Sequence, residues 1–165
     1  IKLLATSRKV GNQYYAMVSP VMIDAKNPLY SVNGVFNAIF IHGNVLGDAM
    51  FYGSGAGKLP TASAVVADVV DCAKNKGRNI MMSWSEEKLD LLQIDDVKSR
   101  FFVRVSGHAA ERQSEIEELF GKVEIVAVPS LSEEFAFITG EITEQEYREK
   151  AEKLDGIQSR IRARI

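Results

Sequence analysis

Residues 44–70, NVLGDAMFYGSGAGKLPTASAVVADVV, pass from an alternating, strand-like pattern through closely spaced glycines into an amphipathic helix. Gly53, Gly55 and Gly57 occupy every second position between the two patterns. Glycine adopts positive φ and lets other groups approach the backbone, and a helix N-terminus attracts anions through its free N–H groups. We therefore expect a nucleotide or another anionic group beside this loop. The alternative is a tight strand-to-helix turn that holds no ligand.

Neither of two common phosphate-binding motifs fits this loop. A P-loop requires G-x-x-x-x-G-K-[ST], but Leu59 follows Gly57-Lys58, and Tyr52 stands where the first glycine belongs. The Rossmann fingerprint G-x-G-x-x-G requires an acidic residue about 20 positions later, beyond a second strand, whereas the spacing here is G-x-G-x-G. The loop is therefore expected to close a nucleotide site whose main part lies elsewhere.

The sequence around the loop predicts a sheet covered by one long helix. Apolar runs bounded by turn residues predict strands at residues 2–7, 14–23, 34–42 and 45–52, and Gly43-Asn44 suits a tight hairpin between the last two. The helix has a stripe at three-and-four spacing that we expect to be buried. The stripe consists of Ala62, Val65, Val66, Val69, Val70 and Ala73. Since one helix covers one face of such a sheet, the other face is expected to meet a missing domain or a twin subunit.

The composition changes over residues 83–98, which carry SEEKLD and QIDDVK, and we place a domain boundary near Lys98. The pattern that follows predicts strands at residues 101–106, 123–128, 135–140 and 157–165, and helices at 109–120 and 144–154. This βαββαβ order predicts a ferredoxin-like unit. The expected fold class is α+β: a mixed or antiparallel sheet with one long covering helix, then the ferredoxin-like domain.

Charge and composition exclude several classes of protein. The formal net charge of −2 and the pI of about 5.8 give no basic field for nucleic acid. Arg160, Arg162 and Arg164 alternate along the last predicted strand, which predicts one solvated face. The single cysteine, Cys72, allows no internal disulfide and indicates a reducing compartment, the cytoplasm. No apolar run reaches the roughly 20 residues that span a membrane.

Three segments, in order and at family spacing, resemble the homoserine dehydrogenases. They are NPLYSVNGVFNAIFI at residues 27–41, GDAMFYGSGAG at 47–57 and PTASAVVADVVD at 60–71. Members of this family interconvert L-homoserine and L-aspartate 4-semialdehyde with NAD(P)(H) in threonine and methionine biosynthesis. They use an N-terminal Rossmann domain and a substrate-binding domain that dimerises. The resemblance covers residues 1 to about 73, and it implies that residues 1–97 belong to the substrate-binding and dimerisation domain.

The resemblance also assigns roles in the glycine loop. It implies that Gly57 approaches the dinucleotide and that Gly55 and Ala56 shape the loop, while we expect Thr61 to satisfy free N–H groups in the first helical turn. Lys58 either adds charge near a phosphate or is simply solvated. The preference between NAD and NADP depends on the Rossmann half, which is not in this sequence.

The catalytic lysine and the monovalent-cation site of the family lie upstream of the matched residues. We therefore assign no catalytic residue and no metal ligand, and His42 has no metal-binding partner at ligand spacing. The chain opens on Ile1 in a strand-like run, so we expect an excerpt of a longer polypeptide that is inactive alone.

Residues 98–165 resemble, by their order of elements, the ACT domains that sense amino acids. Those domains place Asp-x-Pro-Gly or a close variant after the first strand, whereas this chain has SGHAA at residues 106–110. One interpretation is a threonine sensor, and the other is a structural or dimerising domain that has lost its pocket. Three functions thus remain open: part of an oxidoreductase, which we prefer, a regulatory amino-acid-binding module, or a dimerisation module. The expected assembly is a homodimer or a higher homo-oligomer.

Overall fold

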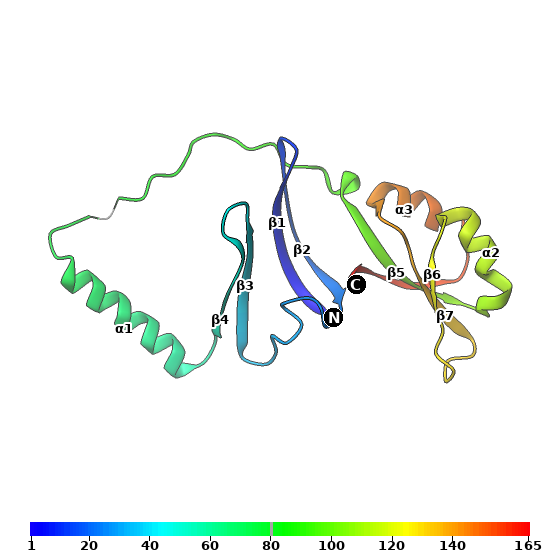
Figure 1. Ribbon diagram of the computed structural model, residues 1–165, viewed down its shortest axis with the longest axis horizontal. Helices are drawn as coiled ribbons and strands as arrows, with labels where there is room; N and C mark the ends of the chain where they lie inside the picture. Colours follow the sequence, from blue (N-terminus) through cyan, green and yellow to red (C-terminus); the bar gives the residue numbers. More distant parts are fainter. Residues whose placement is uncertain (80) are drawn as a thin grey trace. The chain divides into compact units, whose positions relative to one another are not determined.

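The computed structural model describes residues 1–79 and 81–165, which form two compact units (Figure 1). The first consists of Ile1–Asp24 together with Lys88–Ile165, and the second of Ala25–Glu87. These units do not follow the expected boundary near Lys98, because the first two strands join the C-terminal sheet. The assignment of residues 1–97 to an enzyme domain and of 98–165 to a sensing domain concerns the parent enzyme, and it stays a prediction.

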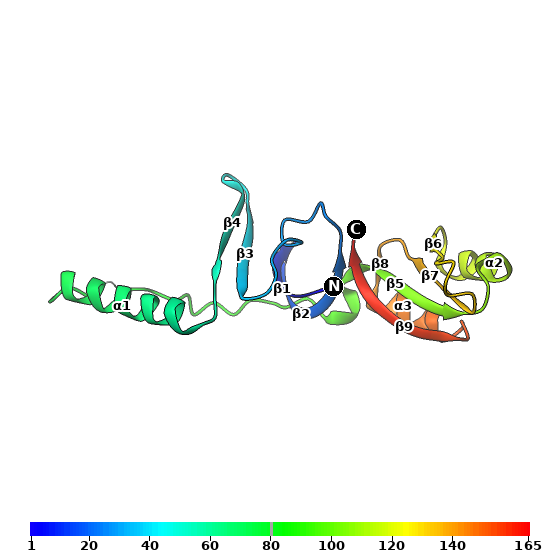
Figure 2. The ribbon, with the colours of Figure 1, turned by 90° about the horizontal axis from the view of Figure 1, so that it is seen from below.

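The described residues of the first unit form a seven-stranded sheet (Figure 2). Its strands are β1 (Lys2–Val10), β2 (Gln13–Ile23), β5 (Lys98–Ser106), β6 (Glu124–Val126), β7 (Glu134–Ile138), β8 (Ile142–Thr143) and β9 (Ile157–Arg164). They lie in the order β1-β2-β9-β5-β7-β6, with β8 beside β5. Strands β2 and β9 run parallel and the other neighbours antiparallel, so the sheet is mixed, as predicted.

The C-terminal part of this sheet has the predicted order of elements. Helix α2 (Ala109–Phe120) lies between β5 and β6, and helix α3 (Glu144–Ala151) precedes β9. Helix α2 has the predicted bounds, whereas α3 ends before residue 154. The βαββαβ prediction is confirmed, with the short β8 and the 3-10 helix η1 (Ile94–Asp96) as additions.

The hydrophobic core lies between this part of the sheet and its two helices. Alternate residues of β5 point toward the helices and are buried: Phe101, Val103 and Val105. Ile116 and Phe120 from α2 and Tyr147 from α3 pack against them. The Phe101 and Tyr147 ring centroids lie 4.6 Å apart. Both helices therefore cover the same face of the sheet.

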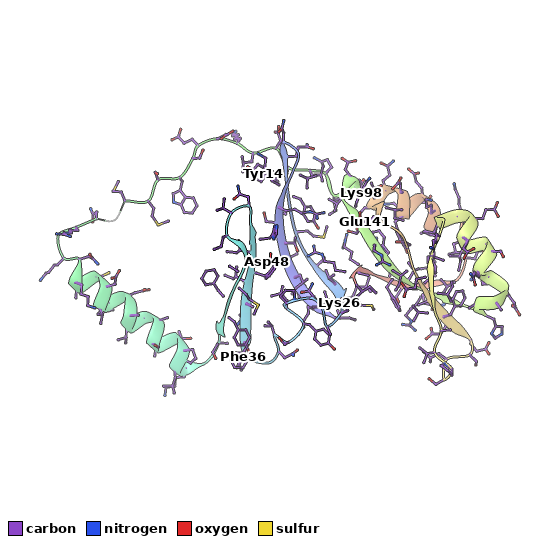
Figure 3. The ribbon with its side chains drawn as sticks, viewed as in Figure 1. Tyr14, Lys26, Phe36, Asp48, Lys98 and Glu141 are labelled. Carbon is purple, nitrogen blue, oxygen red and sulfur yellow. The ribbon has the colours of Figure 1, made fainter. Side chains whose placement is uncertain are left out.

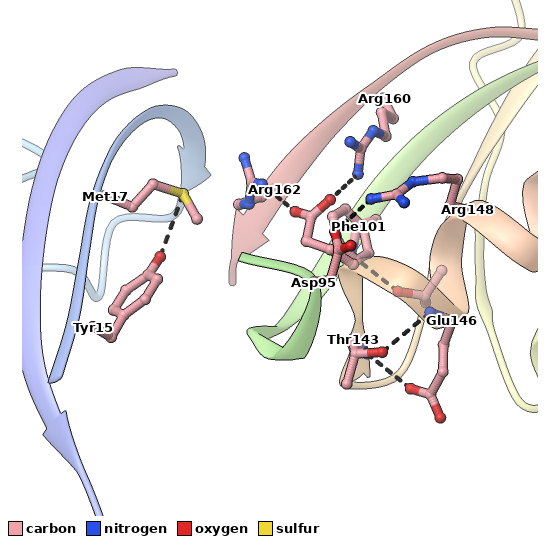
Figure 4. A network of polar contacts seen from close by, with 11 residues as sticks. Tyr15, Met17, Asp95, Phe101, Thr143, Glu146, Arg148, Arg160 and Arg162 are labelled. Atoms are coloured by element: carbon pink, nitrogen blue, oxygen red, sulfur yellow. Dashed lines mark hydrogen bonds and ion pairs between the residues drawn. The ribbon is translucent and has the colours of Figure 1, made fainter. Parts of the chain in front are cut away.

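Two arginines of strand β9, Arg160 and Arg162 (Figure 4), bind a buried carboxylate at the start of α3. Glu144 has a side chain that is 5 % exposed, and it accepts hydrogen bonds from Arg160 Nη1 at 2.7 Å and from Arg162 Nη2. Arg164 donates to Thr6 Oγ1. The prediction that these arginines form one solvated face holds only in part: Arg160 and Arg164 are exposed, but the Arg162 side chain is only 21 % exposed. A buried carboxylate requires partners, and two arginines of β9 supply them.

Helix α3 begins with a capping box. Thr143 Oγ1 accepts a hydrogen bond from the Glu146 N–H at 3.1 Å, and the Thr143 N–H donates to Glu146 Oε2 at 2.8 Å. The hydrogen bond from the Thr143 N–H to the Glu146 carboxylate is the main reason why the pKa of Glu146 is lowered below its ordinary value of 4.5. The sequence Thr-Glu-Gln-Glu thus defines the start of the helix.

We expect Glu146→Gln to make the stability less dependent on pH in acid. A carboxylate whose pKa is lowered by folding stabilises the protein above its unfolded pKa, and that contribution disappears as the pH falls through the folded pKa. The difference in urea midpoint between wild type and variant should therefore be present at neutral pH and shrink below about pH 4. Glu149→Gln, which loses a carboxylate that accepts from the Gln145 side chain, is the control. A constant difference from neutral to acid pH would contradict the capping role.

The second unit holds a two-stranded hairpin and one helix. Strands β3 (Phe36–Gly43) and β4 (Gly47–Ser54) pair antiparallel, and helix α1 (Lys58–Lys74) follows. Residues 44–46 form the turn, so Val45, which we expected in a strand, lies in the turn and is 92 % exposed. Gly47, with φ of +74°, closes the turn.

The expected four-stranded sheet with a buried helix stripe is wrong in this structure. Strands β1 and β2 pair with β9, and the hairpin forms a sheet of its own. No residue of the α1 stripe is buried, and its valines are between 45 and 63 % exposed. The helix is amphipathic as predicted, but the strands that were expected beneath it have another partner. No helix among the described residues is long and apolar enough to cross a membrane.

Candidate functional site

The glycine loop connects the end of β4 directly to the start of α1. Gly57 is the N-cap of the helix, with φ of +117°, and its carbonyl oxygen accepts from the Thr61 N–H at 3.1 Å. No side-chain hydrogen bond caps this helix end among the described residues, so the expected capping by Thr61 is not found. The first N–H groups, those of Lys58 and Leu59, have no partner within a helix. They remain available to an acceptor from outside.

The three glycines of this segment have different physical roles. A Cβ on Gly55 would lie 2.0 Å from Asn37 Nδ2, so any other residue here would force the Asn37 side chain of β3 to move. Gly57 requires glycine because of its positive φ, which residues with a side chain rarely adopt. A Cβ on Gly53 would meet nothing within 4 Å. The three glycines, which look equivalent in the sequence, therefore differ: Gly55 avoids a clash, Gly57 allows a positive φ, and Gly53 has open space around it.

The loop fits an anionic group such as a phosphate. Its helix end has free backbone N–H groups, no acidic residue in the first turn and a lysine at its first position. A Cβ on Gly57 would meet only atoms of Pro60 within 4 Å, the nearest at 3.5 Å, so the space directly beside Gly57 is open among the described residues. The helix dipole adds positive potential at the same place. Gly55, Ala56 and Gly57 have no titratable side chain, so the loop itself can bind and orient an anion but supplies no group that moves a proton.

Phe36 lies at the end of the hairpin from which the glycine loop leaves (Figure 3), and it belongs to an aromatic pair. Phe36, which pairs in register with Ser54, stacks on Tyr52 with ring centroids 4.9 Å apart and an interplanar angle of 14°. Both residues are partly exposed, at 41 % and 52 %. This places a flat apolar surface beside the glycine loop, which the sequence analysis did not identify.

His42 has an acidic neighbour that sequence spacing did not reveal. It pairs in register with Asp48, and the His42 Nδ1 atom lies 2.5 Å from Asp48 Oδ1. Both side chains are well exposed, at 77 % and 62 %. The described residues contain no group of three or more His, Cys, Asp or Glu that could hold a metal ion.

A separate pocket of about 340 Å³ lies in the first unit, beside the loop between β5 and α2. One wall consists of Gly107, His108 and the first turn of α2, and the opposite wall comes from residues 127–135. The residues of that opposite wall are Ala127, Val128, Pro129, Leu131, Ser132, Glu134 and Phe135. His108 is the N-cap of α2 and makes no side-chain capping bond.

Hydrogen bonds and an ion pair connect the residues around this pocket. Gly107 has φ of +101°, and its N–H donates to the Glu133 carbonyl oxygen at 2.9 Å. Glu134 is engaged by Arg104, whose Nη2 lies 2.7 Å from Oε2. The volume is at the lower end of the range for small-molecule sites, about 300 to 1,000 Å³. The residues after β6 could not be assigned from sequence, because only the fold brings them next to Gly107.

Comparisons with known proteins show similarity to one family over part of the chain. Residues 1–70 match the family model described as homoserine dehydrogenase. The chain is 39 % identical over 108 residues to a homoserine dehydrogenase of Lactococcus lactis, a match that covers 64 % of this chain and 25 % of that protein. A homoserine dehydrogenase of Corynebacterium glutamicum is 49 % identical over 81 residues, which cover 46 % of this chain and 18 % of the relative.

Solved structures extend the similarity to the whole chain. A homoserine dehydrogenase from Thiobacillus denitrificans superposes with a TM-score of 0.77 at 25 % identity, covering 99 % of this chain and 42 % of that one. For a homoserine dehydrogenase of S. aureus, the TM-score is 0.70 at 24 % identity, which shows a shared fold. The chain thus spans about a quarter of the first curated relatives and about two fifths of the matching structures.

Proposed function

We propose that this chain is part of a homoserine dehydrogenase, an NAD(P)-dependent oxidoreductase that interconverts L-homoserine and L-aspartate 4-semialdehyde, and the similarities to that family support the proposal. The observation that carries the proposal is the uncapped, glycine-lined N-terminus of α1, which lies within the residues that match the family model. Residues 1–97 would contribute to the domain that binds substrate and dimerises. The chain alone would be inactive, because the family's Rossmann domain and catalytic lysine lie upstream of the matched residues.

The dinucleotide would lie against the loop of Gly55, Ala56 and Gly57. The phosphate would accept hydrogen bonds from the N–H groups of Lys58 and Leu59, while Gly57 leaves room for its approach. When bound, the nicotinamide supplies the hydride acceptor for homoserine oxidation. The residues of this chain would hold and orient the dinucleotide and would take no part in proton transfer.

The test of this function is a steady-state assay of the full-length enzyme. L-homoserine should drive the formation of reduced nicotinamide from NAD⁺ or NADP⁺, and the isolated chain should form none under the same conditions. A folded full-length enzyme that reduces neither dinucleotide with L-homoserine would contradict the proposal.

The exposed apolar surface of the second unit supports a dimerising role. The valines of α1 and several residues of the hairpin, including Ile39 and Phe51, are exposed to a degree unusual for a monomer. We propose that the remainder of the dehydrogenase and a second copy cover them in a homodimer or a higher homo-oligomer.

Residues 98–165 are proposed to form an ACT-like domain that binds an amino acid, with threonine as its ligand. Three features support this: the ferredoxin-like strand order β9-β5-β7-β6, two helices on one face of the sheet, and the pocket at the loop after β5. The N-terminus of α2 suits a carboxylate, and Val128, Leu131 and Phe135 provide an apolar wall. A structural domain without a ligand is the alternative, since the loop lacks Asp-x-Pro-Gly.

A thermal unfolding titration of this chain with L-threonine tests the sensing role. A ligand that binds the native state raises the midpoint, by an amount that grows with its concentration relative to Kd. We expect a rise with L-threonine at millimolar concentration and a smaller one with L-methionine, L-lysine and L-homoserine. Equal midpoints with and without all four amino acids would favour the structural alternative.

A further inference from the structure

Arg112 joins the pocket loop to a distant turn of the chain. Its side chain, which is 19 % exposed, projects from α2. Nη1 donates to the carbonyl oxygen of Ser106 at 3.0 Å, and Nη2 donates to that of Asp155 at 3.0 Å. Ser106 ends β5, and Asp155 lies in the turn before β9. One guanidinium group therefore ties together the end of β5, the first turns of α2 and the turn into β9.

The backbone on both sides is shaped to accept this guanidinium group. A Cβ on Gly107 would lie 3.2 Å from Arg112 Cδ, and a Cβ on Gly156 would lie 3.2 Å from Arg112 Nη1. Both glycines have positive φ, +101° and +77°. The two turns thus leave a slot for Arg112 that a side chain at either glycine would narrow.

Strand β9 reinforces the same connection. The Ser106 N–H donates to the Gly156 carbonyl oxygen at 3.0 Å, and Gln158 Nε2 donates to Ser106 Oγ at 2.6 Å. Gln158 is the extra residue of a bulge, because Arg104 pairs with Ser159 and Val105 with Ile157. A bulge changes the direction in which a side chain points, and here it directs Gln158 toward Ser106, next to the pocket loop.

We propose that Arg112 is a positioning residue for the pocket. It does not line the cavity, but its hydrogen bond to Ser106 fixes the adjoining residues Gly107 and His108, which do. This rests on the proposed amino-acid site. The planar fork of arginine reaches two carbonyl oxygens at once, whereas lysine offers a single point charge. Removal of the guanidinium group should therefore make Gly107 and His108 more mobile, and a lysine at position 112 should not restore their order.

The first test is amide hydrogen exchange on the whole 165-residue chain. In Arg112→Met and Arg112→Lys, exchange at the Ser106 and Gly107 amides should accelerate roughly tenfold or more, because local opening becomes easier. Exchange at Phe101 and Thr139, whose amides are bonded in the core, should change little. Glu115→Gln is the matched control, since it removes the negative charge of the surface partner of Arg112 and keeps both backbone contacts. Unchanged exchange at Ser106 and Gly107, or equal acceleration at all four amides, would overturn the proposal.

The second test is the affinity for L-threonine, obtained from the dependence of the unfolding midpoint on its concentration. Arg112→Met and Arg112→Lys should bind L-threonine at least tenfold more weakly than wild type, and Glu115→Gln should bind it as wild type does. Wild-type affinity in Arg112→Met would overturn the positioning role. If wild type itself gives no response to L-threonine while exchange at the loop changes as expected, the sensing function fails and the anchoring of the loop by Arg112 stands.

Discussion

Replacing Gly57 with valine in the full-length enzyme is expected to raise the KM for the dinucleotide roughly tenfold or more, with a much smaller change in the KM for L-homoserine. Valine would place a branched side chain at the mouth of the loop, between the phosphate and the free N–H groups of α1. It would also strain the backbone, since φ is +117° at this position. That strain costs about 1 to 3 kcal/mol of stability, so KM must be compared at a temperature where both proteins are folded.

The matched control is Gly77→Val, just beyond the other end of α1. Gly77 also has positive φ, +80°, and a Cβ there would meet nothing within 4 Å. This variant has the same kind of strain but lies away from the glycine loop, so its KM for the dinucleotide should equal that of wild type. If both variants raise this KM equally, strain alone explains the effect and the cofactor role of Gly57 is contradicted.

The largest loss of stability is expected for Phe101→Ala, at about 3 to 5 kcal/mol. Phe101 is 0 % exposed, packs against Tyr147 and lies under the guanidinium group of Arg160, whose carbon is 5.2 Å from the ring centroid. Its removal leaves a cavity between the sheet and α3. Urea unfolding followed by circular dichroism measures the change in the free energy of unfolding.

Phe102→Ala is the control for this core prediction. Phe102 is the next residue of β5, points to the opposite face and is only partly buried. Its loss should destabilise the chain clearly less than that of Phe101. Equal losses for the two variants would contradict the assignment of the core to the face that α2 and α3 cover.

The elements of the C-terminal part were predictable because each has its own local signal. Helix α2 was predicted with its observed bounds, since Ile116, Leu119 and Phe120 recur on one side of the predicted helix. The buried residues of β5 alternate as a half-buried strand requires. Such signals depend on neighbours in the sequence and so can be recognised without the fold.

The partners of these elements could not be predicted, because periodicity does not identify which strands pair. The parallel pairing of Val21 with Arg162 joins two strands from opposite ends of the chain, and it removed β1 and β2 from their expected place under α1. For the same reason the ion pairs of Glu144 could not be predicted, because its arginine partners depend on the register of β9. The same limit applies to Gly55, where any other residue would force the Asn37 side chain of β3 to move.

The central claim is that the N-terminus of α1 holds the dinucleotide, and amide hydrogen exchange of the full-length enzyme tests it most directly. NAD⁺ or NADP⁺, whichever the enzyme binds, should slow exchange at the Lys58 and Leu59 amides, because these N–H groups would then donate to the phosphate. Amides around Gly77 should be unaffected. Saturation with a dinucleotide that leaves exchange at Lys58 and Leu59 unchanged would contradict the claim.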